Sequence, residues 1–174
     1  MTNKKLETLE TERLRLREAT LDDAAFTLSI YNDSAFLEFI GDKKLRTLED
    51  ARRYITENFI NSYRAHGVGM LVVELKDSNQ PIGFCGLLKR PYFEEPDIGF
   101  AYLPDYTSKG YGYEAARATL NHAMGKLGHK HIQALVSPAN VRSIGLVEKL
   151  GLHYDRDDVL PGQETATKIF AITV

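Results

Sequence analysis

The chain is poor in cysteine and carries almost no excess charge. Cys85 is its single cysteine, so no disulfide can form within the chain, and its strand-like surroundings indicate a core residue. The 22 basic and 24 acidic residues give a formal net charge of −2, without the basic patch typical of nucleic-acid binding. No apolar run reaches the length of a membrane span or a signal sequence. We therefore expect a cytoplasmic protein that binds neither nucleic acid nor membranes.

Motifs for metals and for common nucleotides are also missing. The five histidines form no helical i, i+4 pair and have no cysteine partner, so we expect no metal site. No glycine-rich stretch ends in Gly-Lys-Ser or Gly-Lys-Thr, and a dinucleotide-binding Gly-x-Gly-x-x-Gly would need glycine at Ala115. The sequence thus disfavours nucleotide hydrolysis and dinucleotide binding.

The length and organisation of the chain fit one domain. It has 174 residues, 43% of them hydrophobic, which is enough for a substantial core. No linker, repeat or low-complexity tract divides it. We expect a short tail over residues 1–8 and a single domain over residues 9–174.

The first half of the sequence predicts a strand, two helices and a meander. Residues 13–17 alternate Arg and Leu, so the leucines should face the core and the arginines the solvent. Thr20 with Asp23 and Thr47 with Asp50 are capping-box pairs that each predict a helix start. Three β-rich runs follow, which we expect to pair antiparallel: Met70–Leu75, Ile82–Lys89 and Ile98–Leu103.

The second half of the sequence predicts a strand–helix–strand unit. A helix is expected from Tyr111 to about Leu127, followed by a strand over His131–Val136. Such a unit pairs its two strands in parallel. A helix over Val141–Leu150 and a last strand over Lys168–Val174 complete the chain. The predicted fold class is α/β of the α+β type, a mixed and mostly antiparallel sheet with one βαβ unit and flanking helices.

A glycine-rich loop joins the third meander strand to the next helix. It reads Lys109-Gly110-Tyr111-Gly112. Glycine lets the backbone bend sharply and approach a ligand, and the first N–H groups of a helix lack partners within the helix. Such a junction is suited to an anion such as phosphate. A Gly-x-Gly pair alone is weak evidence, because a tight turn without a ligand would look the same.

Longer motifs around this loop resemble the GNAT superfamily of acyl-CoA-dependent N-acetyltransferases. They are Ile98-Gly99-Phe100-Ala101-Tyr102-Leu103 leading into residues 108–115, Asn140-Val141-Arg142-Ser143 with Glu148-Lys149-Leu150-Gly151-Leu152, and the opening Leu9-Glu10-Thr11-Glu12-Arg13-Leu14-Arg15-Leu16-Arg17. The last two are similar to the ribosomal-protein-alanine N-acetyltransferase branch. The resemblance covers nearly the whole chain and implies a single-domain GNAT-like fold.

The resemblance implies that the chain binds acetyl-CoA as a cosubstrate and needs no metal. The glycine loop would hold the pyrophosphate, and the preceding strand would pair with pantetheine and the thioester carbonyl. The implied cofactor-binding residues are Ala101, Tyr102, Leu103, Lys109, Gly110, Tyr111, Gly112, Tyr113, Asn140 and Ser143.

The implied reaction is direct attack of a primary amine on the thioester. Asp97 is the candidate base and Ser143 the candidate acid, because Val147 stands where many members carry a tyrosine. Glu94 and Glu95 are second-rank candidates for binding a cationic acceptor, since an exposed acidic turn beside Pro96 is the favoured explanation for them. At pH 7 an α-amine of pKa near 8 is about one tenth free base, whereas a lysine-type amine is about one part in 2,500. An α-amine therefore needs less help from a base.

The acceptor and the partners stay open at this stage. A protein N-terminus is the first candidate, and a polyamine, an amino sugar or an aminoglycoside are alternatives. A non-catalytic acyl-CoA-binding regulator fits the missing tyrosine at Val147, since a fold does not fix a function. The early helices between Asp22 and Arg64 could instead serve an interaction domain. The protein could be a monomer or a homodimer.

Overall fold

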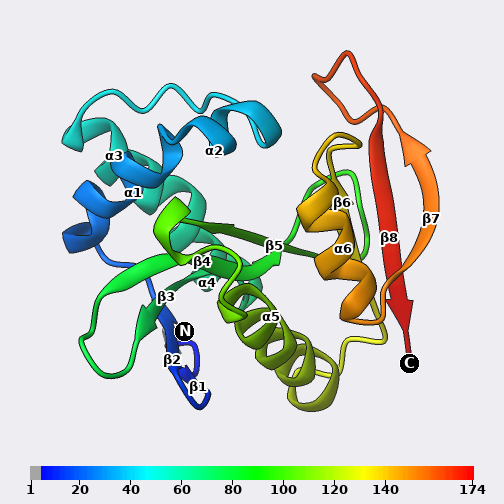
Figure 1. Ribbon diagram of the computed structural model, residues 1–174, viewed down its shortest axis with the longest axis horizontal. Coiled ribbons are helices and arrows are strands. Elements are labelled where there is room, and N and C mark those ends of the chain that lie inside the picture. The colour runs from blue at the N-terminus through cyan, green and yellow to red at the C-terminus, as the bar shows by residue number, and fades with distance from the viewer. Residues whose placement is uncertain (1–4) are drawn as a thin grey trace.

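The computed structural model describes residues 5–174 (Figure 1). The predicted tail over residues 1–8 therefore lies partly outside the described residues. Its described part contacts the domain, because the Leu6 N–H donates to Glu18 Oε1 at 3.1 Å. None of the helices in residues 5–174 is long and apolar enough to cross a membrane.

Eight strands form one sheet. They are β1 (Leu9–Glu10), β2 (Leu14–Glu18), β3 (Met70–Leu75), β4 (Pro81–Leu88), β5 (Asp97–Tyr102), β6 (His131–Val136), β7 (His153–Asp158) and β8 (Thr167–Thr173). Their order is β1-β2-β3-β4-β5-β6-β8-β7. Every pairing is antiparallel except β5 with β6, which is parallel. The predicted meander and βαβ unit are confirmed, whereas β1 and β7 were not predicted.

Helices and short helical turns connect the strands. They are η1 (Leu21–Asp23), α1 (Ala24–Tyr31), α2 (Ser34–Phe39), α3 (Leu48–Tyr54), η2 (Ile55–Ile60), α4 (Asn61–His66), η3 (Pro104–Tyr106), α5 (Tyr111–Asn121), η4 (His122–Lys126) and α6 (Val141–Lys149). Both predicted capping boxes are present, at Thr20 with Asp23 and at Thr47 with Asp50. Both helices predicted before the meander are present, and α2, which lies between them, was not predicted.

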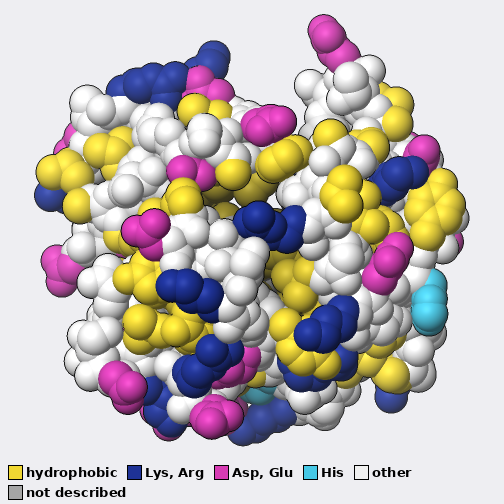
Figure 2. Space-filling model, viewed as in Figure 1, with side chains coloured by type: hydrophobic (Ala, Val, Ile, Leu, Met, Phe, Trp, Pro, Cys, Tyr) yellow, Lys and Arg dark blue, Asp and Glu magenta, His cyan; other side chains and the backbone are white. Residues whose placement is uncertain are grey.

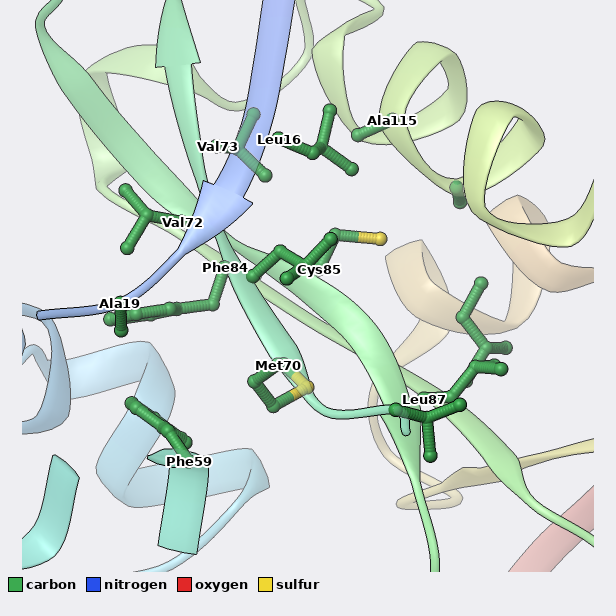
Figure 3. Close-up of a cluster of buried hydrophobic side chains, with 14 of the residues drawn as sticks. Leu16, Ala19, Phe59, Met70, Val72, Val73, Phe84, Cys85, Leu87 and Ala115 are labelled. Atoms are coloured by element: carbon green, nitrogen blue, oxygen red, sulfur yellow. The ribbon is translucent and has the colours of Figure 1, made fainter. Parts of the chain in front are cut away.

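Two helical layers cover opposite faces of the front half of the sheet. On β4, Phe84 packs against Phe59 of η2, with ring centroids 5.2 Å apart. The next residue, Cys85, points to α5, where its sulfur lies 3.5 Å from the hydroxyl of Thr119 (Figure 3). Successive side chains of a strand face opposite sides of the sheet. The front half of the sheet therefore lies between η2 on one face and α5 on the other. Burial raises the pKa of the Cys85 thiol to about 12, which fits the predicted core role.

The arginines of β2 depart from the expected solvated face. Arg17 binds Asp23 at 2.9 Å and Glu74 at 3.0 Å, and Arg15 binds the other oxygen of Glu74 at 3.1 Å. Asp23 and Glu74 are buried, and buried carboxylates need such partners. Arg15 and Arg17 are only partly exposed, and the shared partner Glu74 lies 59 and 57 residues away from them along the sequence.

Candidate active site

Strands β5 and β6 are paired at one position and then separate. The single register pair is Asp97 with Gln133, and the Gln133 N–H donates to the carbonyl of Pro96 at 3.0 Å. On the other side of β5, pairing with β4 continues from Asp97 to Tyr102. The edge of β5 that faces β6 is therefore open beyond Asp97.

The register shows which backbone groups face this opening. The Leu103 N–H donates to the carbonyl of Ile82 at 2.9 Å. Because N–H groups alternate between the two sides of a strand, those of Ala101 and Leu103 point to β4. Those of Phe100 and Tyr102 point into the opening and can bind an extended ligand there.

The glycine loop begins α5 without a side-chain cap. Gly110 is the N-cap residue with φ of 84°, a left-handed conformation that glycine adopts without strain. The Glu114 N–H donates to the Gly110 carbonyl at 3.0 Å, which leaves the N–H groups of residues 111–113 without helical partners. A Cβ on Gly112 would lie 3.3 Å from Leu146 and 3.4 Å from the Tyr102 ring. Little room is left for a side chain at Gly112. The unpaired N–H groups at this helix start can bind an anion.

A carboxylate on α5 fastens this loop to the N-terminal part of the sheet. Glu114 accepts hydrogen bonds from the Thr11 hydroxyl, from the Arg13 backbone N–H at 3.0 Å and from Arg13 Nε at 2.7 Å. Arg13 also donates to the Lys109 carbonyl at 3.1 Å and lies 4.3 Å above the Tyr111 ring. Burial raises the pKa of Glu114, but the hydrogen bonds from Thr11 and Arg13 outweigh it, so the pKa is lowered overall. The motif that opens the sequence thus holds the glycine loop in place.

A cavity of about 590 Å³, here called the loop cavity, lies beside the start of α5. It brings together seven of the predicted cofactor-binding residues: Ala101, Tyr102, Gly110, Gly112, Tyr113, Asn140 and Ser143. Arg142 and Lys149 of α6 also line it, and the Lys149 ammonium lies 4.3 Å from the centre of the Tyr113 ring. The sequence reasoning missed both basic residues as site residues. The sequence signal that could have identified them is their position within the motif of residues 140–152.

A second cavity of about 540 Å³, here called the aromatic cavity, lies next to the first. Both are lined by Phe36, Phe39, Ile40, Phe100, Ala101, Asn140 and Ser143. Sequence reasoning did not predict α2, which supplies Phe36 and Phe39, with Ile40 as its C-cap residue. Figure 2 shows this face of the molecule hollowed between the helices α1–α3 and the half that holds α6 and β8, with hydrophobic side chains along the walls. The two cavities can thus hold two ligands that meet at Ala101 and Ser143.

Asp97 lies in the aromatic cavity with both carboxylate oxygens bound. Arg90 donates to it through Nε at 2.8 Å and through Nη2 at 3.1 Å. The Asp97 side chain is 2% exposed. Burial raises the pKa of Asp97, while the ion pair with Arg90 opposes that rise. No sequence pattern indicates this role of Arg90. The turn over residues 89–96 brings Arg90 next to Asp97 at the start of β5.

Asn140 and Ser143 lie at the start of α6. The Ser143 N–H donates to Asn140 Oδ1 at 3.2 Å, so Asn140 is the N-cap residue of the helix. Ser143 lines both cavities. Val147 follows one turn later and is buried, so this part of the wall is hydrophobic.

The remaining predicted site residues lie at the edge of the site or away from it. Glu94 and Glu95 line neither cavity. Leu103 uses its N–H for β4, and its carbonyl accepts from the Tyr106 N–H at 3.0 Å. Lys109 and Tyr111 lie in the glycine loop but contact Arg13 rather than the loop cavity. Within residues 5–174 no group of three or more His, Cys, Asp or Glu side chains is placed to hold a metal.

The chain matches known proteins over most of its length. Residues 13–153 match the family model described as acetyltransferase (GNAT) domain. The chain is 29% identical over 146 residues to the N-acetyltransferase YnaD of Bacillus subtilis, covering 83% of this chain and 81% of YnaD. A GNAT-family acetyltransferase structure from Bacillus anthracis superposes with a TM-score of 0.80 at 26% identity, covering 96% and 98% of the two chains.

A structure of RimL, a ribosomal L7/L12 α-N-protein acetyltransferase in complex with coenzyme A, shares the fold. Its TM-score is 0.83 at 14% identity, with 97% of this chain and 98% of that chain covered. Together with the family match, the glycine loop at the start of α5 and the open edge of β5 lead to one conclusion. The chain belongs to the GNAT acetyltransferase family and is an acetyl-CoA-dependent N-acetyltransferase.

Proposed function

We propose that this enzyme acetylates an α-amine, such as the N-terminus of a peptide, by direct attack of the amine on acetyl-CoA. The observation that carries the proposal is the meeting of the two cavities at the open edge of β5. The loop cavity has the groups for the coenzyme, and the aromatic cavity has the titratable groups. A donor and an acceptor that enter from the two sides would meet at Ala101 and Ser143.

The loop cavity fits a phosphate-bearing ligand. The free N–H groups at the start of α5 and the positive end of its dipole favour an anion. Arg142 and Lys149 add positive charge along the same wall. We propose that Gly110, Gly112 and Tyr113 hold the pyrophosphate and that the open edge of β5 binds the pantetheine arm.

The N–H groups of Phe100 and Tyr102 are the donors for the developing charge. Attack on a thioester creates an oxyanion, and a fixed N–H near it stabilises the transition state. A thiol of pKa near 8.5 leaves readily, so a weak acid suffices. Ser143 is the proposed acid because its side chain lines both cavities.

The strength of the available base favours an α-amine. Asp97 is the proposed base, yet Arg90 occupies both of its oxygens. Because both oxygens already accept hydrogen bonds from Arg90, Asp97 is a hindered proton acceptor, although burial raises the pKa of its carboxyl. A weak or water-mediated base suits an amine that is partly neutral at pH 7, which an α-amine is and a lysine-type amine is not.

The proposal is tested by comparing coenzyme binding and acetyl transfer in two glycine variants. Gly112→Arg places a long side chain at the start of α5 and should abolish binding of coenzyme A in calorimetry, and with it acetylation of a peptide α-amine. Gly145→Ala is the matched control, because nothing lies within 4 Å of its added Cβ. Undiminished binding by Gly112→Arg would remove the loop cavity from the proposal.

Val147 supports a second candidate, a regulator that binds acyl-CoA without transferring the acyl group. The residue is buried and cannot protonate a thiolate. This candidate requires tight coenzyme binding with no acetylation of any amine. Acetylation at a rate that depends on Gly112 would exclude it.

A further inference from the structure

The aromatic cavity contains more positive than negative charge. Its charged side chains are Lys43, Lys89, Arg90, Glu57 and Asp97, and His66 also lines it. Arg90 and Asp97 neutralise each other in their bidentate pair. The Lys89 ammonium donates to the carbonyl of Phe93. Lys43 and Lys89 are thus opposed by Glu57 alone, which is the wrong balance for a polyamine or an aminoglycoside.

Lys43 differs from Lys89 because its ammonium has neither a carboxylate nor a carbonyl partner among residues 5–174. It forms no ion pair within 4.0 Å among residues 5–174. Burial and then the nearby charge of Arg90 lower the pKa of Lys43. Lys43 lines the cavity wall and is still accessible at the surface. A negative charge brought by a ligand would relieve the repulsion between Lys43 and Arg90.

The loop that carries Lys43 is held in a defined shape. Asp42 Oδ1 accepts from the Lys44 N–H at 2.7 Å and from Arg46 Nη1 at 3.1 Å. The Asn32 side chain donates to the carbonyl of Leu45 at 2.9 Å, and Leu45 is buried. These bonds hold Lys43 at the cavity while its neighbour Lys44 lines neither cavity. The backbone on both sides of Lys43 is therefore fixed, and its side chain lines the cavity.

The rest of the wall suits a small polar ligand. The π-helical segment η2 and the start of α4 contribute Glu57, Asn58 and Asn61. Segments of π-helix occur often at functional sites. The volume of about 540 Å³ falls within the usual range of small-ligand sites.

We propose that the acceptor amine carries an anionic group, a carboxylate or a phosphate, which Lys43 binds while the amine points to Ser143. This inference rests on the proposed function, because it names the acceptor class of the same site. It favours amino acids and short peptides with a free carboxylate over polyamines. Charge complementarity of this kind selects among ligands whose amines are alike.

The test uses acceptors that differ in one charge. Amino acids, dipeptides and tripeptides are each assayed as the free acid and as the C-terminal amide, with rates expressed per free amine. O-Phosphoethanolamine against ethanolamine separates phosphate from carboxylate, and spermidine is the polycation. At the best chain length we expect a KM about tenfold lower for the anionic form, equivalent to about 1.4 kcal/mol. Equal KM values for both forms at every length and in the phosphate pair, or spermidine as the better acceptor, would overturn the inference.

Two lysine variants assign the effect to a residue. Lys43→Met should remove the preference for the anionic form, and Lys44→Met should retain it. A preference that survives in Lys43→Met would reject the role of Lys43. Both variants replace a surface lysine, so we expect both to fold.

A binding measurement separates failure of this inference from failure of the proposed function. N-Acetylated dipeptide acids, their amides and N-acetyl-phosphoethanolamine are titrated into the coenzyme A-bound protein by calorimetry. About tenfold tighter binding of an anionic ligand, lost in Lys43→Met, supports the inference even where no amine is acetylated. Equal binding of acid and amide, or no binding by any anionic ligand, contradicts it even if transfer occurs.

Discussion

Replacing Glu114 by glutamine tests how the glycine loop is held. The carboxylate accepts three hydrogen bonds from Thr11 and Arg13, and its side chain is 19% exposed. Glutamine keeps one oxygen acceptor and loses the charge. Hydrogen bonds to a charged group contribute about 1.5–3 kcal/mol each when buried and less when exposed. We expect Glu114→Gln to lower the free energy of unfolding by about 2 kcal/mol.

The stabilisation by the Glu114 charge should depend on pH in a defined direction. The pKa of Glu114 is lowered in the folded protein, so its contribution to stability is present above the unfolded pKa. It is lost as the pH falls through the lowered folded pKa. The gap in free energy of unfolding between wild type and Glu114→Gln should be largest near neutral pH and should narrow as the pH falls below the usual glutamate pKa of about 4.3.

Thermal unfolding followed by circular dichroism from pH 7 down to pH 3.5 measures the gap. For a chain of this length, about 2 kcal/mol corresponds to a Tm lower by about 4–8 °C at pH 7. The exposed pair Lys126–Glu7 offers a control, since Lys126→Met should change Tm very little. A gap of the same size at every pH, or no gap at pH 7, would refute the role assigned to the Glu114 charge.

Three further substitutions have defined outcomes. Gly86→Ala would put a Cβ 2.1 Å from the Gly69 carbonyl oxygen, and we expect a loss of about 3 kcal/mol in a denaturant titration; a wild-type midpoint would contradict this. The Tyr102 hydroxyl is buried and has no hydrogen-bond partner within the described part of the chain, so Tyr102→Phe should leave Tm unchanged or raise it by a few degrees, and a clear fall would show a missed partner. Asp97→Asn leaves Arg90 without its counter-charge and should lower the free energy of unfolding by about 2–3 kcal/mol. If Asp97 is the base, the kcat of the Asp97→Asn variant should also fall most below pH 7.5. An equal fall at every pH would indicate a structural role alone.

The sequence predicted the elements whose local signals agree with their environment. The bounds of β3 and β6 were predicted to the residue, and both capping boxes start helices as expected. These strands are buried and rich in β-branched or aliphatic residues, which makes their pattern clear. The strand β7 was missed because His153-Tyr154-Asp155-Arg156-Asp157-Asp158 is charged and lies at an exposed edge. Only its pairing with β8 makes it a strand.

The candidate site was predictable where backbone geometry defines it. Gly110 and Gly112 mark the start of α5, and the motif around Asn140 marks the start of α6. Arg90 was not predictable, because its partner Asp97 lies across a turn and neither residue type reveals the pair. The contact of Arg13 with Glu114 joins residues 101 positions apart. Contacts of this kind depend on the tertiary fold and leave no periodic trace in the sequence.

The central claim is that the protein acetylates an α-amine at the junction of the two cavities. The most direct measurement is mass spectrometry of an equal mixture of a dipeptide acid, an Nα-blocked lysine and spermidine after incubation with acetyl-CoA. Wild type and Gly145→Ala should acetylate the dipeptide α-amine first, and Gly112→Arg should form no product above the rate without enzyme. Bound coenzyme A without any acetylated amine, or preferential acetylation of the lysine side chain or spermidine, would contradict the claim.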